Sequence, residues 1–254
     1  MNLTPPDISD ATSDIRLEQL LKRSDIWRGN SRALVPQLTV DSGHAQINAS
    51  LLNGGWPVRS LVEVCQRGLQ HQEWMLFSPA MKAGSGYIVL LNPPALPFCQ
   101  ALIQAGIDLE RVIIVQVVDK ADFLASFVEL ARTESCEVLL AWQQKQAMSY
   151  TELRKCLLAS NEGSGLCVLF RPESAQQQSS PASLRLLAEI TPTAVQIKFF
   201  KQKGVLQQHQ SEPIKLPLPT AWKGLLPYHL LDETAKRTAA SQLTNVVSIK
   251  RGKR

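Results

Sequence analysis

The sequence lacks the features that mark membrane, secreted and metal-binding proteins. No apolar run approaches the roughly eighteen residues of a membrane-spanning helix, and the start, Met1-Asn2-Leu3-Thr4-Pro5-Pro6, has neither the basic residues nor the apolar core of a signal peptide. The five cysteines are odd in number and form no C-x-x-C pair. We therefore expect buried, reduced thiols, no metal site and a cytoplasmic location.

The sequence also lacks the residues that nucleophilic or nucleotide chemistry requires. No Gly-x-Ser-x-Gly motif is present to expose a serine at the end of a strand. A phosphate-binding loop after the strand 61–64 would need several glycines, a lysine and a Ser or Thr hydroxyl. The stretch 65–73 has one glycine, Gly68, and neither of the other two groups. At the helix start that follows, we expect His71 and Glu73 to be surface residues.

A second requirement for nucleotide hydrolysis is also missing. An acidic residue should follow an apolar strand to hold magnesium. The best candidate strand, 138–141, is followed instead by Trp142, Gln143 and Gln144. We therefore expect a protein that is not an enzyme and needs no cofactor, with an ATPase of unusual loop as a less favoured alternative.

Apolar segments that alternate with helical spacers indicate an α/β fold. With 254 residues, 44% apolar and 19% charged, the composition is that of an ordinary globular protein. Near-continuous apolar strands are typical of a parallel sheet buried on both faces, and five are predicted, at 61–64, 87–91, 112–115, 138–141 and 166–170. We predict a mostly parallel sheet with helices on both faces, extended by antiparallel strands at 184–190 and 195–200.

Start and stop signals delimit the helices. Pro97 begins one that Gly106 ends, and its apolar face would consist of Phe98, Ala101, Leu102 and Ala105. Asp119 is expected at the N-cap of the next helix. Ser149 and Glu152 have the spacing of a capping box, which predicts a third helix from residue 150 onward.

The chain divides into three parts by composition. Residues 1–50 contain a short amphipathic helix at 13–23, which either packs on its own domain or forms an arm for a neighbour. Residues 51–219 form the α/β core, with Trp56 inside it. Residues 220–254 contain an apolar cluster that either packs on the sheet or anchors a partner, and we assign it to partner binding: Trp222, Leu225, Leu226, Tyr228, Leu230 and Leu231.

Positive charge is concentrated at one end of the sequence. The net charge is +5, and four of the positive charges belong to Lys250, Arg251, Lys253 and Arg254, which leaves +1 for the rest. Four basic residues provide non-specific, salt-sensitive attraction to DNA phosphates. The alternative is a solvated end without a partner.

Several short segments, in order, resemble the RecA superfamily and more closely the ImuA group of translesion-synthesis accessory proteins. They are Asp25-Ile26-Trp27-Arg28-Gly29, Leu52-Asn53-Gly54-Gly55-Trp56-Pro57, Leu61-Val62-Glu63-Val64, Asn92-Pro93-Pro94, Ala105-Gly106-Ile107-Asp108-Leu109-Glu110-Arg111-Val112 and Arg171-Pro172. In the register of RecA, Gln72 falls at the phosphate-binding lysine and Glu73 at the magnesium-binding hydroxyl. The resemblance thus implies a RecA-like fold with a degenerate phosphate loop at Gly68, Gln72 and Glu73.

The same resemblance implies a role in the response to DNA damage. An ImuA-like protein would work with ImuB and an error-prone DnaE-class polymerase in mutagenic lesion bypass, and would also contact RecA. The stretch from Tyr87 to Arg171 is similar to SulA as well, at Asn161-Glu162-Gly163 and Phe170-Arg171-Pro172. That similarity implies the alternative of a cell-division inhibitor that binds FtsZ, although the extra length before Leu51 and after Pro181 favours the first reading.

Overall fold

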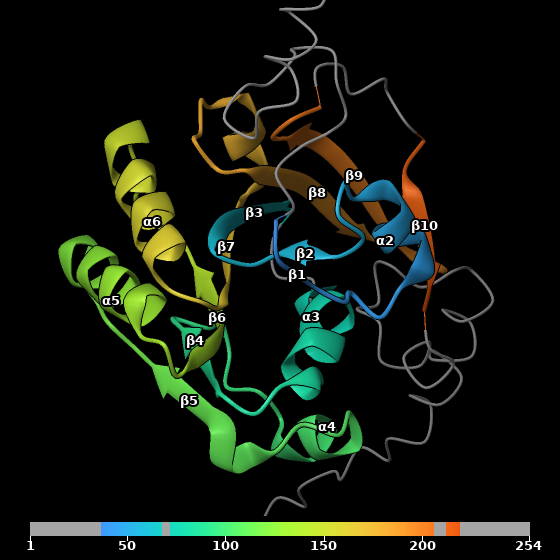
Figure 1. Ribbon diagram of the computed structural model, residues 1–254, viewed down its shortest axis with the longest axis horizontal. Coiled ribbons are helices and arrows are strands. Elements are labelled where there is room, and N and C mark those ends of the chain that lie inside the picture. The colour runs from blue at the N-terminus through green and yellow to red at the C-terminus, as the bar shows by residue number, and fades with distance from the viewer. Residues whose placement is uncertain (1–36, 68–71, 206–211, 219–254) are drawn as a thin grey trace, which may run out of the picture.

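The computed structural model describes residues 37–67, 72–205 and 212–218. An eight-stranded sheet lies at the centre of their fold (Figure 1). In spatial order the strands are β10 (Ile214–Pro217), β9 (Ala194–Gln202), β8 (Leu184–Ile190), β3 (Ser60–Gln66), β7 (Leu166–Pro172), β6 (Cys136–Trp142), β4 (Tyr87–Leu91) and β5 (Val112–Val115). The five predicted strands are all present, and β3 is longer at both ends than expected.

The sheet is parallel from β8 to β5 and antiparallel beyond β8. β3 pairs in parallel with both β7 and β8, and β4 with both β5 and β6. The expected antiparallel pair is confirmed as β8 and β9, with β10 added outside it. The prediction of a mostly parallel α/β sheet with antiparallel strands towards its C-terminal side is therefore correct.

Helices cover both faces of the sheet, as predicted. The buried apolar residues of α2 (Ala45–Ser50), α3 (Gln72–Ala83) and α4 (Cys99–Gln104) belong to one apolar cluster. Those of α5 (Lys120–Arg132) and α6 (Tyr150–Glu162) belong to another. Neighbouring strand residues alternate between the two, since Val62 packs with the first cluster and Leu61 with the second.

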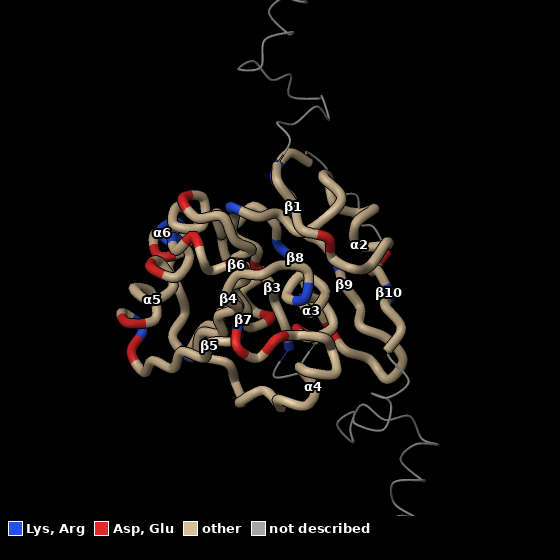
Figure 2. Tube along the Cα trace, turned by 60° about the horizontal axis from the view of Figure 1, so that its bottom comes forward, with Lys and Arg blue, Asp and Glu red and all other residues tan. Residues whose placement is uncertain are grey.

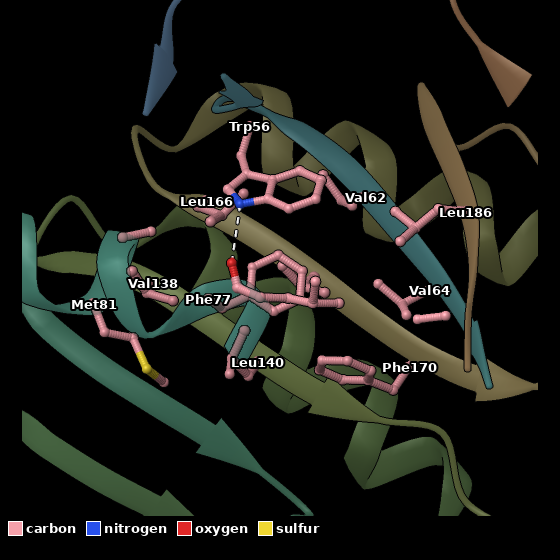
Figure 3. Packing of buried hydrophobic residues seen from close by; sticks show 14 of the residues in the cluster. Trp56, Val62, Val64, Phe77, Met81, Val138, Leu140, Leu166, Phe170 and Leu186 are labelled. Atoms are coloured by element: carbon pink, nitrogen blue, oxygen red, sulfur yellow. Dashed lines mark hydrogen bonds between the residues drawn. The ribbon is translucent and has the colours of Figure 1, made fainter. Parts of the chain in front are cut away.

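Aromatic rings fill the first cluster between α3 and the sheet (Figure 3). The ring of Phe77 lies 5.0 Å from that of Trp56 and 5.9 Å from that of Phe170, measured between centroids. The Trp56 indole N–H donates to the Leu76 carbonyl at 3.3 Å, so its one polar atom is satisfied while the side chain is fully buried. The expected core position of Trp56 is confirmed.

The second cluster is built largely from small and sulfur-containing residues. Alanines and cysteines from β6, β7, α5 and α6 pack among its larger side chains. Burial raises the pKa of Cys136 and Cys156 to about 12, which keeps these thiols protonated at neutral pH. Four of the five cysteines are buried as expected, and Cys99 is exposed.

Most local helix signals are confirmed, but α4 begins at Cys99 and not at Pro97, and its apolar face differs from the prediction. Ser149 and Glu152 form the full capping box of α6, and Asp119 occupies the N-cap of α5, although its side chain makes no capping hydrogen bond. Gly106 has a φ of +79°, a conformation that suits glycine after a helix end. The predicted apolar face of α4 is wrong, because Leu102 alone in this helix is buried and Phe98 is 73% exposed.

Residues before position 51 contribute to the core. β1 (Thr39–Val40) pairs antiparallel with β2 (Trp56–Pro57), and Ile47 of α2 is fully buried in the first cluster. η1 (Leu109–Arg111) and η2 (Glu173–Gln177) are short 3-10 turns next to β5 and after β7. The predicted helix at 13–23 lies outside the described residues.

The aromatic cluster predicts a large effect of Phe77→Ala. Removal of this fully buried ring should lower the free energy of unfolding by about 3–5 kcal/mol, because a cavity remains between Trp56 and Phe170. Urea unfolding measures the change. The matched control is Phe98→Ala, which should change stability by no more than about 0.5 kcal/mol since that ring is exposed. Equal losses in both variants would contradict the described core.

Candidate functional site

The start of α3 faces the carboxyl end of β3, where parallel sheets bind ligands. After β3 the chain continues to β4, which lies beyond β7 and β6 in the sheet. After β7 it continues in the opposite direction, to β8 on the far side of β3. In open α/β sheets, ligands bind outside the carboxyl ends of strands where such connections diverge. The predicted degenerate phosphate loop lies here, and its Gly68 falls outside the described residues.

Gln72 occupies this place with a buried side chain. Its Nε2 donates to Oε1 of Gln66 at the end of β3, at 2.8 Å, and to the carbonyl of Ala188 on β8, at 3.5 Å. Gln72 is fully buried, and its Oε1 has no hydrogen-bond partner among the described residues. The residue that the resemblance to RecA aligns with a phosphate-binding lysine is thus a neutral bridge between two strands and the helix.

Glu73 is also buried, which corrects the expectation that it lies on the surface. It is 2% exposed and belongs to the first turn of α3. The periodicity of α3 turns this position towards the sheet, and a carboxyl group is favourable at the positive end of a helix dipole. The helix end that could attract a phosphate therefore already carries an acidic side chain.

Arg67, the first residue after β3, is held by acidic side chains. Its Nε and NH2 donate to the two carboxylate oxygens of Glu173 at 2.8 and 3.0 Å, and its NH1 lies 3.6 Å from Glu189 Oε1. The hydrogen bond from Arg67 lowers the pKa of Glu173. A phosphate would have to displace these carboxylates to use this cation.

At the end of β6 the structure places an aromatic stack. The rings of Trp142 and Phe170 lie 4.8 Å apart and are nearly parallel, at 15°. Trp142 Nε1 has no acceptor among the described residues. Next to it, Oε1 of Gln143 accepts from Nε of Arg171 at 2.8 Å. Where a nucleotide hydrolase would carry a magnesium-binding carboxylate, this strand end carries an indole and an amide.

A buried ionic cluster on the other face of the same strands was missed from the sequence. Glu63 of β3 is fully buried, and its Oε1 accepts from NH1 of Arg171 at 3.1 Å and from NH2 of Arg185 at 2.6 Å. The hydroxyl of Ser180 donates to its Oε2 at 2.6 Å. One carboxylate thus connects side chains from three adjacent strands, β8, β3 and β7.

The two arginines of this cluster have further partners. Arg171 donates from NH2 to Oε1 of Gln178 at 2.7 Å, and Arg185 donates from NH2 to the Ala175 carbonyl at 2.7 Å. The guanidinium of Arg185 also lies over the ring of Phe200, 4.8 Å from its centroid. These contacts satisfy charged groups that burial would otherwise destabilise.

The cluster influences ionisable neighbours. Burial first, and then the charge of Glu63, raises the pKa of the Cys65 thiol to about 12. The pKa of Lys201 is lowered, chiefly by burial and then by Arg185. Lys201 is nevertheless fixed in place, since its Nζ donates to the Ser180 carbonyl at 2.7 Å. Cys65 is therefore unreactive at neutral pH.

A sequence signal for this cluster existed. Glu63 and Arg171 are charged residues within otherwise apolar strands, and a charge in such a position needs a partner. Both also belong to segments that carry the family resemblance. The structure joins these segments through an ion pair across 108 residues of sequence.

The other predicted site residues lie outside the described residues. They are the apolar cluster Trp222, Leu225, Leu226, Tyr228, Leu230 and Leu231 and the basic residues Lys250, Arg251, Lys253 and Arg254. Among the residues that the structure describes, no group of three or more His, Cys, Asp or Glu side chains is placed to hold a metal ion. No helix in the same residues is long and apolar enough to span a membrane.

Comparisons with known proteins leave the family open. No protein-family model matches the chain, and a search of curated proteins finds no match. The resemblance to ImuA, RecA and SulA therefore stays a prediction.

The ionic cluster predicts a strong effect of Glu63→Gln. The change leaves two buried guanidinium groups without a carboxylate and should lower the free energy of unfolding by about 3–5 kcal/mol, measured by urea unfolding. The control is Glu173→Gln, which removes an exposed partner of Arg67 and should leave stability unchanged. Replacement of Glu63, Arg171 and Arg185 together by Leu, Met and Met should recover much of the loss. Stability equal to wild type in Glu63→Gln would contradict the cluster.

Proposed function

We propose that this protein is a non-catalytic accessory factor of DNA-damage-induced translesion synthesis. It acts through contacts with an ImuB-type protein and an error-prone DnaE-class polymerase, and also contacts RecA. The proposal combines the family resemblance with the hydrogen bonds that Gln72 makes at the start of α3, next to the end of β3. It assigns partner binding to the segment from Trp222 to Leu231.

The observation that carries the proposal is the buried bridge made by Gln72. A nucleotide phosphate at the start of α3 needs free backbone N–H groups and a cation. Here Gln72 binds Gln66 and Ala188, Glu73 is buried beside it, and Arg67 is paired with Glu173. A side chain that completes the core at this place supports a scaffold role over nucleotide turnover.

The sheet itself supports the same reading. The strand before the loop, β3, is flanked on both sides by parallel strands and tied to them by the Glu63 cluster. The ends of β3 and β6, where nucleotide chemistry would need a cation and a carboxylate, carry a glutamine bridge and an aromatic stack. This combination supports our proposal that the protein works by binding other macromolecules.

A pull-down from DNA-damaged cells tests the proposal. We expect the full-length tagged protein to recover the ImuB-type protein and the DnaE-class polymerase, identified by mass spectrometry. A chain cut at Pro219, or the double variant Trp222→Ala with Leu226→Ala, should recover much less of both, because apolar anchors dominate such contacts. The matched control is Phe98→Ala, an exposed aromatic residue outside the proposed segment.

Two outcomes of the pull-down would contradict the proposal. Recovery of neither protein by the full-length chain would remove its basis. Recovery of FtsZ in their place, together with filamentous cells on overexpression, would favour the SulA-like alternative.

The proposal also predicts no response to nucleotide. Addition of about 1 mM ATP with magnesium should not change the melting temperature, because a ligand stabilises only a protein that it binds. Differential scanning fluorimetry measures this, with the Gln72→Ala variant as a second sample in which the bridge to Ala188 is removed. A clear rise in the melting temperature of the wild-type protein would revive the ATPase alternative.

A further inference from the structure

The two edges of the eight-stranded sheet differ in how well they are protected from pairing with another strand. At one edge, β10 carries an exposed Lys215 and ends in Pro217, and charge and proline are common devices that stop edge-to-edge pairing. At the other edge, β5 has the sequence Val-Ile-Ile-Val with neither device. Its Ile113 and Ile114 are 40% and 39% exposed. Figures 1 and 2 show the two strands at opposite ends of the sheet.

The free edge of β5 presents backbone groups in a defined register. The Val115 carbonyl accepts from the Asn92 N–H at 2.8 Å, so Val115 faces β4, and the alternation of a strand turns Ile113 the same way. The N–H and carbonyl of Ile114, the carbonyl of Val112 and the N–H of Gln116 therefore point away from β4. No described strand lies on that side.

Acidic residues precede and follow β5 in the sequence. Asp108 and Glu110 precede β5, Asp119 and Asp122 follow it, and all four are exposed and form no ion pair among the described residues. The neighbouring cations are already engaged, because Arg111 binds Glu137 at 3.2 Å and Lys120 binds Glu152 at 2.8 Å. The edge thus suits an extended apolar strand with basic residues next to it.

We propose that residues 246–254 of this chain bind the β5 edge as an added strand. Val246-Val247-Ser248-Ile249 would pair with β5, and Lys250, Arg251, Lys253 and Arg254 would lie against the carboxylates. β-branched residues favour such pairing, and an added strand gains its affinity from main-chain hydrogen bonds. This inference does not depend on the proposed function, and it gives the basic residues a protein ligand in place of DNA.

The intervening chain is long enough to reach the edge. The described chain stops at Leu218 beside β9, where the Leu218 N–H donates to the Thr193 carbonyl. Seven strand spacings of about 4.8 Å, or about 34 Å in all, separate β10 from β5. The 27 residues from 219 to 245 can span up to about 90 Å when extended.

Charge disfavours the simplest competing occupant, a second copy of β5. Antiparallel pairing of two β5 strands would bring the carboxylates of one copy close to those of the other, and like charges across a strand pair are destabilising. The segment 246–254 brings no acidic residue and four basic ones. It therefore complements the edge, whereas a second edge repels it.

Amide-resolved hydrogen exchange on the full-length protein tests the proposal. We expect slow exchange at Ile114 and Gln116 as well as at Ile113 and Val115. In Val247→Pro, which cannot donate from the added strand, Ile114 and Gln116 should exchange at least about tenfold faster, while Ile113 and Val115 stay protected by β4. The matched control is Thr238→Pro, the same substitution outside the segment, which should change none of these rates.

The role of charge and the competing DNA reading are tested in the same experiment. Reversal of the four basic residues to Glu, or a high salt concentration, should also accelerate exchange at Ile114 and Gln116. The proposal is overturned if both amides already exchange rapidly in the wild-type chain. It is equally overturned if the two amides exchange rapidly while the basic residues bind a random-sequence DNA duplex.

Discussion

One carboxylate in the middle of the sheet constrains much of the structure. Glu63 has no exposed surface, and its two oxygens accept from Arg171, Arg185 and Ser180, all at least 108 positions away in the sequence. A buried charge of this kind is tolerated only with its full set of partners. The register of β3 against β7 and β8 is therefore specified by polar contacts on one face as well as by packing of apolar side chains on the other.

At the carboxyl ends of these strands, several polar side chains bind other residues of the protein. Gln72 binds Gln66 and the backbone of β8, Gln143 binds Arg171, and Arg67 binds Glu173. The carboxyl end of a parallel sheet is a common place for ligands. In this protein several of the polar side chains there are hydrogen-bonded to one another or to the backbone of β8.

The sequence predicts regular elements better than burial of polar residues. Apolar runs and the Ser149–Glu152 box located strands and helices, because these signals depend on neighbours in the chain. Local patterns could not place Glu73 inside or Phe98 outside, since each depends on which face of a helix meets the sheet. The charges of Glu63 and Arg171 within apolar strands indicate that each needs a partner, but which residues pair depends on the order of β8, β3 and β7.

The long sequence separations in the Glu63 cluster also impose an order on folding. β3 is the first strand of the large sheet to leave the ribosome, yet both of its neighbours come from beyond residue 165. Pairing across such separations is slow, because much of the chain must be confined before the contact forms. Until Arg185 has been synthesised, Glu63 lacks one of its two cationic partners, so we expect the pairing of β3 with β7 and β8 to form late.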